Sequence, residues 1–267
     1  MTLALACNRS QAPKILVLYY SQNGTTEQVA QALQNSLGAD IEAILPVIPY
    51  DGDFQATIER GRKELESNFL PDIQPFKADI SSYDVIFLGY PIWFGTYAQP
   101  IATVLATQDF TGKKIVPFCT FGSGGLDSSV KNIKEKLPKA EILPGYGVRQ
   151  ARIDAMPAEV DRFLKAGGFI KGEVIKLEAF SDPQPVTEEE AAIFDAAVGD
   201  YPMMHAKAVE VASRAVPEGR EYLFTAQDLP REMPGGEAPK NLPPAGTMKV
   251  YVLAADGQAP VFTQVVR

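Results

Sequence analysis

The sequence predicts an α/β domain with a doubly wound, five-stranded parallel sheet, followed by a small α+β domain. The first prediction rests on short aliphatic runs that alternate with amphipathic segments of helical period over residues 13–180 of the 267. The second rests on a change of pattern, because one helical segment and then several strand-like runs occupy residues 186–267. We therefore expect two domains with these bounds.

Five aliphatic runs are expected to form the parallel sheet. They cover residues 14–20, 40–45, 83–89, 114–120 and 141–148. The third is continuously apolar, as in a strand that is buried on both faces. Segments of helical period lie between them at residues 25–37, 97–107, 127–137 and 157–165, with a candidate extension of the last towards Phe180. Residues 46–80 form an insertion bounded by prolines, with its own helix at 54–68.

The C-terminal part begins with a helix-start signal. Residues 181–185 are typical of a linker, and Thr187 with Glu190 matches a capping box that opens a helix through Val198. Strands are expected at residues 207–216, 221–227 and 247–254, with a fourth candidate at 259–266. Residues 230–244 are rich in proline and glycine and are expected to form an exposed loop.

The composition excludes several classes of function. A net charge of −8 argues against a nucleic-acid binder, and no apolar run is long enough to span a bilayer. Cys7 and Cys119 differ in surroundings, so we expect no disulfide framework, and Cys119 in its apolar run is expected to be buried. With His205 as the only histidine, a multi-histidine metal site cannot form, and no metal is expected.

Residues 1–12 are expected to be a leader or a truncated lipoprotein signal. The run Met-Thr-Leu-Ala-Leu-Ala-Cys resembles the end of a bacterial lipoprotein signal, although the basic n-region is missing and the apolar stretch is short. Either an upstream extension completes the signal and Cys7 is lipidated, or the segment is a frayed leader. Membrane attachment at the bacterial cell envelope is expected only in the first case, and a cytoplasmic location in the second.

Three polar or glycine-rich loops follow the first, third and fourth predicted strands. Ligands of open α/β sheets bind at the carboxyl ends of the strands, so these loops form the candidate site. The candidate cofactor-binding residues are Ser21, Gln22, Asn23, Gly24, Thr25 and Thr26 in the first loop, Tyr90, Pro91, Ile92, Trp93, Phe94 and Gly95 in the second, and Thr120, Phe121, Gly122, Ser123 and Gly124 in the third.

These residue types favour a planar ligand with one phosphate. The first loop supplies hydroxyls, an amide and backbone N–H groups at a helix N-terminus, which is a phosphate site without a basic residue. Trp93 and Phe94 can cover a planar ring, and the glycines of the third loop allow N–H groups to approach polar ring atoms. Flavin mononucleotide (FMN) fits this description. The plain alternatives are an N-cap turn for the first loop and core aromatics for the second.

The same loops resemble the flavodoxin family. SQNGTT at residues 21–26 is similar to its phosphate loop. YDVIFLGYPIWFGTYAQP at 83–100 and GKKIVPFCTFGSGG at 112–125 resemble a bacterial group with a Gly-Tyr-Pro-Ile-Trp loop. The resemblance covers about residues 14–180 and implies a flavodoxin-like fold with FMN as cofactor. One departure is Phe121, where that group is expected to carry a histidine near the pyrimidine end of the ring.

The resemblance implies a redox protein that transfers electrons between partner proteins, with no catalytic residue of its own. An FMN-dependent reductase of quinones or NAD(P)H is the enzymatic alternative, in which a small substrate stacks on the ring. A third alternative is a non-catalytic, lipid-anchored binding protein. On the insertion helix, Arg60, Arg62 and Lys63 are expected to form a solvated face, with the steering of an acidic partner as the alternative.

The C-terminal domain resembles cystatin-like folds at the level of pattern. Residues 215–219, Ala-Val-Pro-Glu-Gly, stand where the inhibitors of that fold carry their binding hairpin, so protease inhibition is disfavoured. We expect a docking module for a partner. A lid over the flavin edge is the alternative.

Overall fold

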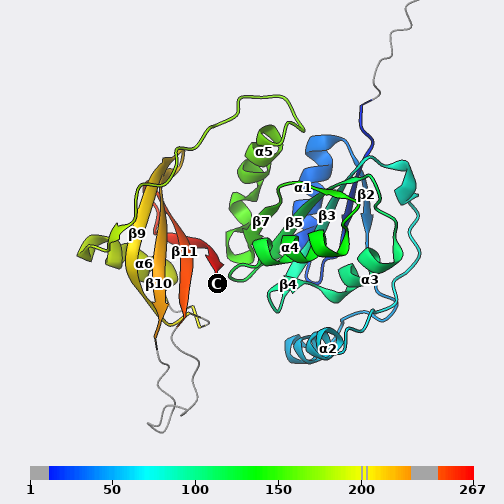
Figure 1. Cartoon of the computed structure of the whole chain (residues 1–267), viewed down its shortest axis with the longest axis horizontal. Helices are drawn as coiled ribbons and strands as arrows, with labels where there is room; N and C mark the ends of the chain where they lie inside the picture. The colour runs from blue at the N-terminus through cyan, green and yellow to red at the C-terminus, as the bar shows by residue number, and fades with distance from the viewer. Residues whose placement is uncertain (1–11, 200, 203, 230–245) are drawn as a thin grey trace, which may run out of the picture. The chain divides into compact units, whose positions relative to one another are not determined.

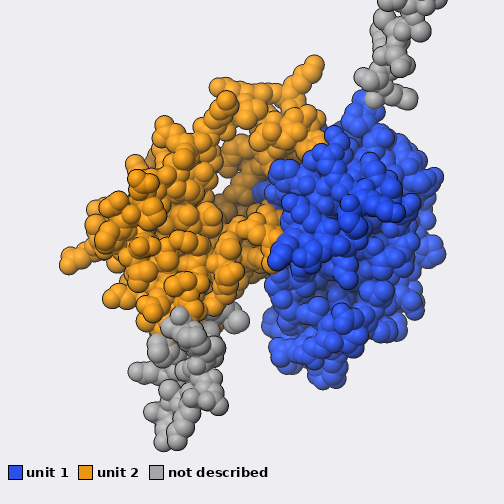
Figure 2. All heavy atoms as spheres, viewed as in Figure 1, with its two compact units in different colours: residues 1–119, 130–146 blue, residues 120–129, 147–267 orange. Residues whose placement is uncertain are grey.

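The computed structural model describes residues 12–199, 201–202, 204–229 and 246–267. Cys7 and the predicted loop at 230–244 lie outside these ranges, so the expectations for both remain predictions. The chain forms two compact units (Figure 2). The first comprises Met1–Cys119 and Val130–Tyr146, and the second comprises Thr120–Ser129 and Gly147–Arg267.

A parallel sheet forms the centre of the N-terminal part of the chain (Figure 1). β1 (Ile15–Tyr19) pairs in parallel with both β2 (Asp40–Ala43) and β3 (Val85–Trp93). The sheet continues through β5 (Lys114–Phe121) to β6 (Glu141–Ile142), in the order β2-β1-β3-β5-β6. This arrangement, with its helices, confirms the predicted flavodoxin-like fold class.

The central strands are buried on both faces, which explains their continuously apolar sequences. Leu16, Val17 and Leu18 of β1 and their partners Ile86, Phe87 and Leu88 of β3 are all fully buried. Alternation of apolar and polar residues is absent because neither face of these strands meets water. The apolar runs therefore identify the strands that form the middle of the sheet.

The helices lie close to their predicted positions. They are α1 (Thr25–Leu37), α2 (Phe54–Glu66), α3 (Gln99–Thr107), α4 (Leu126–Lys136) and α5 (Met156–Ala166), with short 3₁₀ helices η1 (Ile80–Ser82) and η2 (Gln150–Ala155). The candidate extension of α5 towards Phe180 is wrong. Two glycines follow Ala166, and Gly168 adopts a left-handed conformation (φ 71°) that ends the helix.

The fifth predicted strand divides into two. β6 is followed by β7 (Tyr146–Arg149), which also pairs with β5. The residues between them include Pro144 and Gly145. Proline has no N–H group to donate to the ladder, so a continuous strand through this position is disfavoured.

The C-terminal part is a helix with an antiparallel sheet, as predicted. The helix is α6 (Glu188–Val198), and the strands are β8 (Gln184–Pro185), β9 (Ala206–Val216), β10 (Gly219–Asp228), β11 (Thr247–Ala255) and β12 (Val261–Val266), in the order β12-β11-β10-β9-β8. The capping box is confirmed, because Glu190 N–H donates to Thr187 Oγ1 at 3.3 Å and Thr187 N–H donates to the Glu190 carboxylate at 3.0 Å. The end of the predicted linker is itself a strand, since β8 pairs with β9.

The core of this sheet is aromatic and aliphatic. Phe194 of α6 meets Phe224 of β10 edge to face at 5.2 Å between ring centres. Phe262 of β12 and Val250 of β11 are fully or almost fully buried beside them.

None of the helices in the described ranges is long and apolar enough to cross a membrane.

The Phe118 ring of β5 occupies the space beside Gly89 of β3, which gives a stability prediction. A methyl group at this position would lie 2.1 Å from the Phe118 ring of β5. We expect Gly89→Ala to lower the free energy of unfolding by about 1–3 kcal/mol through overpacking. The penalty should be smaller in a Phe118→Leu background, because the ring is gone. Urea unfolding of the four proteins measures this, and equal penalties in both backgrounds would contradict it.

Candidate functional site

The first loop joins β1 to α1 through a left-handed glycine. Gly24 adopts φ 84° and precedes the first helical residue, Thr25. The Thr25 N–H donates to Asn23 Oδ1 at 3.3 Å, and the Glu27 N–H donates to Ser21 Oγ at 3.2 Å. Loop side chains therefore satisfy N–H groups of the first helical turn, which have no partner within the helix itself.

The chemistry of this loop fits an anion. Residues 21–26 carry hydroxyls and amides but no charged side chain. The positive end of the α1 dipole adds to their attraction for a negative group. Thr25 and Thr26, the first two residues of α1, are buried, with 6% and 1% exposure. A phosphate would accept the N–H bonds that Ser21 and Asn23 accept in this structure.

The second predicted loop is a β-hairpin, so most of its residues belong to the end of β3. β3 continues through Trp93 and pairs in antiparallel fashion with β4 (Thr96–Tyr97). Phe94 (φ 51°) and Gly95 (φ 79°) form the two-residue turn. Positive φ at both central positions is the requirement of a type I′ turn, the usual connection of a tight hairpin. The Phe94 side chain is 44% exposed at its tip.

Members of the second predicted set occupy different environments. Tyr90 is fully buried and meets Tyr97 edge to face at 6.2 Å. Pro91, Ile92 and Trp93 are half-buried. The accessible aromatic surface of this set therefore lies towards the end of the hairpin, at Trp93 and Phe94.

Trp93 is held in an aromatic cluster that the sequence analysis missed. Tyr50 lies 5.0 Å from Trp93 and Tyr20 lies 5.8 Å from it, both in edge-to-face geometry. Tyr20 and Tyr50 are themselves 6.1 Å apart. Tyr20 directly precedes the first loop and Tyr50 belongs to the insertion, so three segments distant in sequence meet at Trp93.

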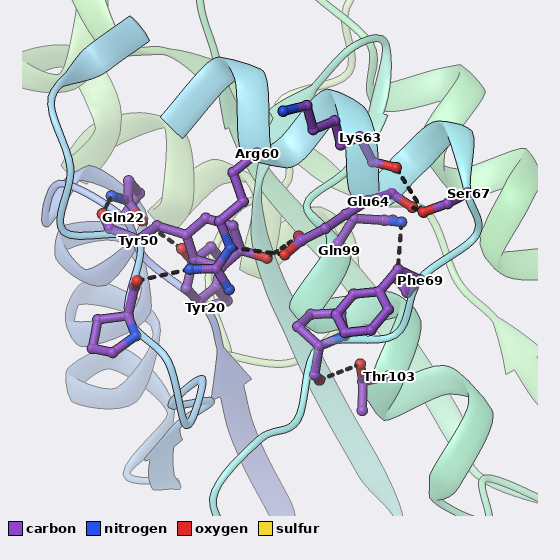
Figure 3. A network of polar contacts seen from close by, with 12 residues as sticks. Tyr20, Gln22, Tyr50, Arg60, Lys63, Glu64, Ser67, Phe69, Gln99 and Thr103 are labelled. Carbon is purple, nitrogen blue, oxygen red and sulfur yellow. Dashed lines mark hydrogen bonds and ion pairs between the residues drawn. The ribbon is translucent and has the colours of Figure 1, made fainter. Parts of the chain in front are cut away.

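Polar contacts brace this cluster (Figure 3). The Tyr20 hydroxyl donates to Gln22 Oε1 at 2.5 Å, and Gln22 Nε2 donates to the Tyr50 carbonyl. The Tyr50 hydroxyl donates to Glu64, which is 7% exposed. Gln22 of the first loop is thereby tied to the insertion and to α2.

Arg60 takes part in the same network, so its assignment to a solvated face was wrong. Its guanidinium lies 3.7 Å from the centre of the Tyr50 ring, and it donates to Glu64 and to the Pro49 carbonyl, both at 2.8 Å (Figure 3). Lys63, in contrast, pairs with the exposed Glu59. The spacing of Arg60 and Glu64, four residues apart on one helix, is the sequence signal that could have indicated this pair.

A glycine lets α2 approach the hairpin. A methyl group at Gly61 would lie 3.3 Å from Trp93 and 3.4 Å from Phe94. A glycine within a helix is costly, and close approach is a reason to keep one. The structure thus links the first two predicted sets within the first unit, because Gln22 bonds to Tyr20 and Tyr50 and both tyrosines contact Trp93.

The third predicted set belongs to the second unit. Thr120 and Phe121 end β5 and are each 4% exposed, while Gly122, Ser123 and Gly124 lead into α4. The Gly122 carbonyl accepts from Arg149 Nε at 2.8 Å, and the Ser123 carbonyl accepts from the Val265 N–H at 2.7 Å. Neither Arg149 nor Val265 was among the predicted residues, because no local pattern indicates a contact with the third loop.

The described residues provide no candidate site for a metal ion. They contain no group of three or more His, Cys, Asp or Glu side chains that could hold a metal ion. Cys119 is fully buried within β5, as predicted.

Comparison with known proteins identifies the family. A family model described as Flavodoxin matches residues 14–159, more than half of the 267-residue chain. The chain belongs to the flavodoxin family. A search of the curated proteins gave no match. The cystatin-like pattern of the C-terminal part lies outside the matched residues and remains a prediction.

Solved structures similar to this flavodoxin-family chain come from several bacteria. A candidate flavoprotein from Bacteroides eggerthii DSM 20697 is 32% identical, with 56% of this chain and 96% of that chain covered and a TM-score of 0.49. One from Bacteroides uniformis ATCC 8492 is 25% identical, with 57% and 99% covered and a TM-score of 0.51. A flavoprotein from Lactobacillus acidophilus NCFM in complex with FMN is 25% identical, with 56% and 97% covered and a TM-score of 0.48.

The aromatic cluster should make the free energy of unfolding depend on pH in the alkaline range. Burial raises the pKa of Tyr20 and of Tyr50 above 10, and the hydrogen bond with Glu64 raises that of Tyr50 further. Unfolded tyrosines lose their protons near pH 10 while the folded ones keep them. The contribution of these two tyrosines to the free energy of unfolding should therefore be constant well below pH 10 and fall above it.

Tyr50→Phe isolates this contribution, because it keeps the ring and removes the titrating hydroxyl. Between pH 10 and 11 the slope should be shallower than in the wild type by at most about 1.4 kcal/mol per pH unit. Urea unfolding followed by Trp93 emission measures both slopes. Parallel slopes for the two proteins would show that Tyr50 titrates normally.

Proposed function

We propose that this flavodoxin-family protein binds FMN and transfers electrons between redox partners. The observation that carries the proposal is the junction of a neutral anion cradle with an aromatic wall inside one compact unit. Gln22 provides this junction, since it bonds both to Tyr20 and to the Tyr50 backbone, and both tyrosines contact Trp93. A planar ring that carries one phosphate matches such a pair of surfaces.

The first loop is proposed to hold the phosphate. Ser21, Asn23, Thr25 and Thr26 would bind it through hydroxyls, an amide and backbone N–H groups, assisted by the α1 dipole. The absence of lysine and arginine from residues 21–26 means that hydrogen bonds, and not an ion pair, would provide the affinity.

The hairpin is proposed to support the ring of the cofactor. Trp93 and Phe94 supply aromatic surface, and the third loop, residues 120–124, is assigned to polar ring atoms because it follows β5, the neighbour of β3 in the sheet order. Bound FMN would supply the redox chemistry. The surrounding chain would set affinity and potential.

The tyrosines beside Trp93 have a supporting role in this proposal. The hydroxyls of Tyr20 and Tyr50 are protonated at neutral pH, as tyrosines ordinarily are, and they donate to Gln22 and Glu64. Burial raises the pKa of both groups further. They therefore fix the wall and do not act as bases. The insertion, through Tyr50 and α2, would shield the same wall from water.

The visible absorption spectrum of the purified protein tests the proposal first. Flavin bands in the protein as isolated, or after reconstitution with FMN, are the expected result. A protein that binds no flavin after reconstitution would support the non-catalytic alternative. Steady-state oxidation of NADPH with a quinone separates the electron carrier, which should show little turnover, from a reductase.

Substitutions in the first loop test the phosphate assignment. Asn23→Ala and Thr26→Ala should each weaken FMN binding about tenfold to a hundredfold, because a hydrogen bond to a charged group contributes about 1.5–3 kcal/mol. Ser67→Ala is a matched control, since Ser67 caps α2 by bonding to the Lys63 carbonyl and lies outside the loop. Fluorescence titration with FMN measures all four proteins. Wild-type affinity in both loop variants would refute the assignment.

The single tryptophan reports on the ring assignment. Trp93 emission should be quenched as FMN binds and should recover when the flavin is removed, because a stacked or adjacent flavin accepts excitation energy. Trp93→Phe provides the blank for flavin emission. Emission that stays constant through a saturating titration would place the ring away from Trp93 and leave Phe94 as the remaining exposed aromatic of the hairpin.

A further inference from the structure

A cavity of about 370 Å³ lies within the first compact unit. Its walls come from the end of α2 and the residues after it, from β4, from α3 and from the part of α4 that belongs to this unit. None of the candidate cofactor-binding residues lines it. The cavity is therefore a second place in this unit with room for a small ligand, since pockets of this size commonly hold one.

The segment that follows α2 forms one wall of the cavity and is bonded to α3. Asn68, in a left-handed conformation (φ 52°), turns the chain just after α2. Gln99 Nε2 donates to the Phe69 carbonyl at 3.3 Å, and Thr103 Oγ1 donates to the Pro71 carbonyl at 2.7 Å (Figure 3). These bonds hold the wall in place without a ligand.

The other walls leave the space open. Asn132 Nδ2 of α4 donates to Thr96 Oγ1 of β4 at 2.9 Å, which ties these two elements together. Ala102 and Ala106 lie four residues apart on α3 and therefore on one face of it, and their small side chains do not fill the cavity. The apolar residues that line the cavity are Leu65, Leu70, Ala102 and Ala106.

The Tyr97 hydroxyl lacks a hydrogen-bond partner among the described residues. Tyr97 is 7% exposed and lines the cavity. Every fully buried side-chain nitrogen or oxygen in the described part of the chain does have a hydrogen bond. The unbonded Tyr97 oxygen must therefore reach accessible space, and the cavity provides that space.

Gln99 supplies the complementary group. It is 6% exposed, and its amide nitrogen is bonded to the Phe69 carbonyl, which can only accept. Its amide oxygen, Oε1, accepts no hydrogen bond from the described residues, so it too must reach the accessible space of the cavity that Gln99 lines. The cavity thus offers one nearly buried donor, at Tyr97, and one nearly buried acceptor, at Gln99.

The charged residues of the cavity favour a neutral ligand. Glu135 and Lys136 line it and are both exposed. Burial raises the pKa of the Tyr97 hydroxyl, and the Glu135 carboxylate raises it further, so a negative charge lies near this hydroxyl. An anionic ligand at Tyr97 would be repelled by Glu135, and a cation would leave water without a buried carboxylate to pair with.

We propose that this cavity binds a small neutral amide that carries an apolar ring. The amide carbonyl accepts from the Tyr97 hydroxyl, an N–H of the amide donates to Gln99 Oε1, and the ring contacts Leu65 and Ala102. A purely apolar compound would leave both polar groups unpaired, and a carboxylate would bring a second negative charge beside Glu135. This site goes beyond the proposed electron transfer and does not depend on FMN.

Benzamide and benzoate are a matched pair of probes, because they share a ring and differ only in a carboxamide against a carboxylate. Ligand-observed NMR titration of the full-length protein measures both dissociation constants. Benzamide should bind with a dissociation constant of about 1 mM or lower, which is ordinary for so small a ligand, and benzoate about tenfold more weakly. Equal affinities for the two probes, or no binding of benzamide at about 10 mM, would overturn the proposal.

Three substitutions locate the bound probe. Tyr97→Phe keeps the ring and removes the hydroxyl, so it should weaken benzamide binding about tenfold. Ala102→Leu fills the cavity and should abolish measurable binding. Tyr83→Phe is the matched control, because the Tyr83 hydroxyl donates to Asp40 at 2.7 Å and Tyr83 does not line the cavity, so affinity should stay within about twofold of the wild type. Wild-type affinity in both cavity variants would show that the probe binds elsewhere.

Unfolding of the ligand-free protein separates a binding role of Tyr97 from a structural one. Because the hydroxyl has no partner among the described residues, Tyr97→Phe should leave the urea midpoint unchanged or raise it. A lower midpoint would show that the hydroxyl supports the fold, and the inference would fail. Circular dichroism confirms that each variant is folded before benzamide is added.

A second benzamide titration, with FMN present at saturation, distinguishes this inference from the proposed function. The affinity for benzamide should be the same with and without FMN. Displacement of benzamide by FMN would place the probe at the flavin surface, which overturns this inference and leaves the proposed function standing. A protein that binds benzamide in the cavity but binds no FMN would overturn the proposed function alone.

Discussion

The parallel pairing of β1 with β3 is the constraint on which the candidate site depends. It sets Tyr19 opposite Gly89 and continues into the loops, where the Tyr20 N–H donates to the Gly89 carbonyl at 2.9 Å. Because the pairing is parallel, β1 and β3 both end at the same edge of the sheet, where β1 leads to α1 and β3 leads into the hairpin. Trp93 and the first loop can meet only in this register, since a slip of one residue would turn each side chain to the other face.

The insertion supplies the packing that these two loops lack. A loop of small polar residues and a hairpin tip have little packing of their own, and Tyr50, Arg60 and Glu64 provide a second layer behind them. This layer combines a partly buried ion pair with an aromatic face, so its energy depends on several partners at once. Gly61 allows the helix to approach closely enough for that layer to form.

The C-terminal sheet presents a different physical problem, which is an unpaired edge. The glycine-rich third loop and Arg149 meet that edge at β12, and the outward N–H of Val265 is satisfied there. An edge strand is exposed to unwanted pairing unless something covers it. The conformation of residues 122–124 therefore depends both on β5, which they follow, and on Arg149 and β12, which they contact.

The sequence by itself determined the alternation of buried strands and helices, the bounds of α1, the capping box at Thr187 and the family. These features depend on local periodicity and on short motifs, which a single stretch of chain carries. Tertiary structure decided the hairpin at Trp93, the aromatic wall with Tyr20 and Tyr50, the contact of Arg60 with Tyr50 and the contacts of Arg149. The aromatic wall and the Arg149 contacts require groups tens of residues apart to meet, as Tyr50 meets Trp93 and Arg149 meets Phe262. No local pattern records which partner a buried polar or aromatic side chain finds.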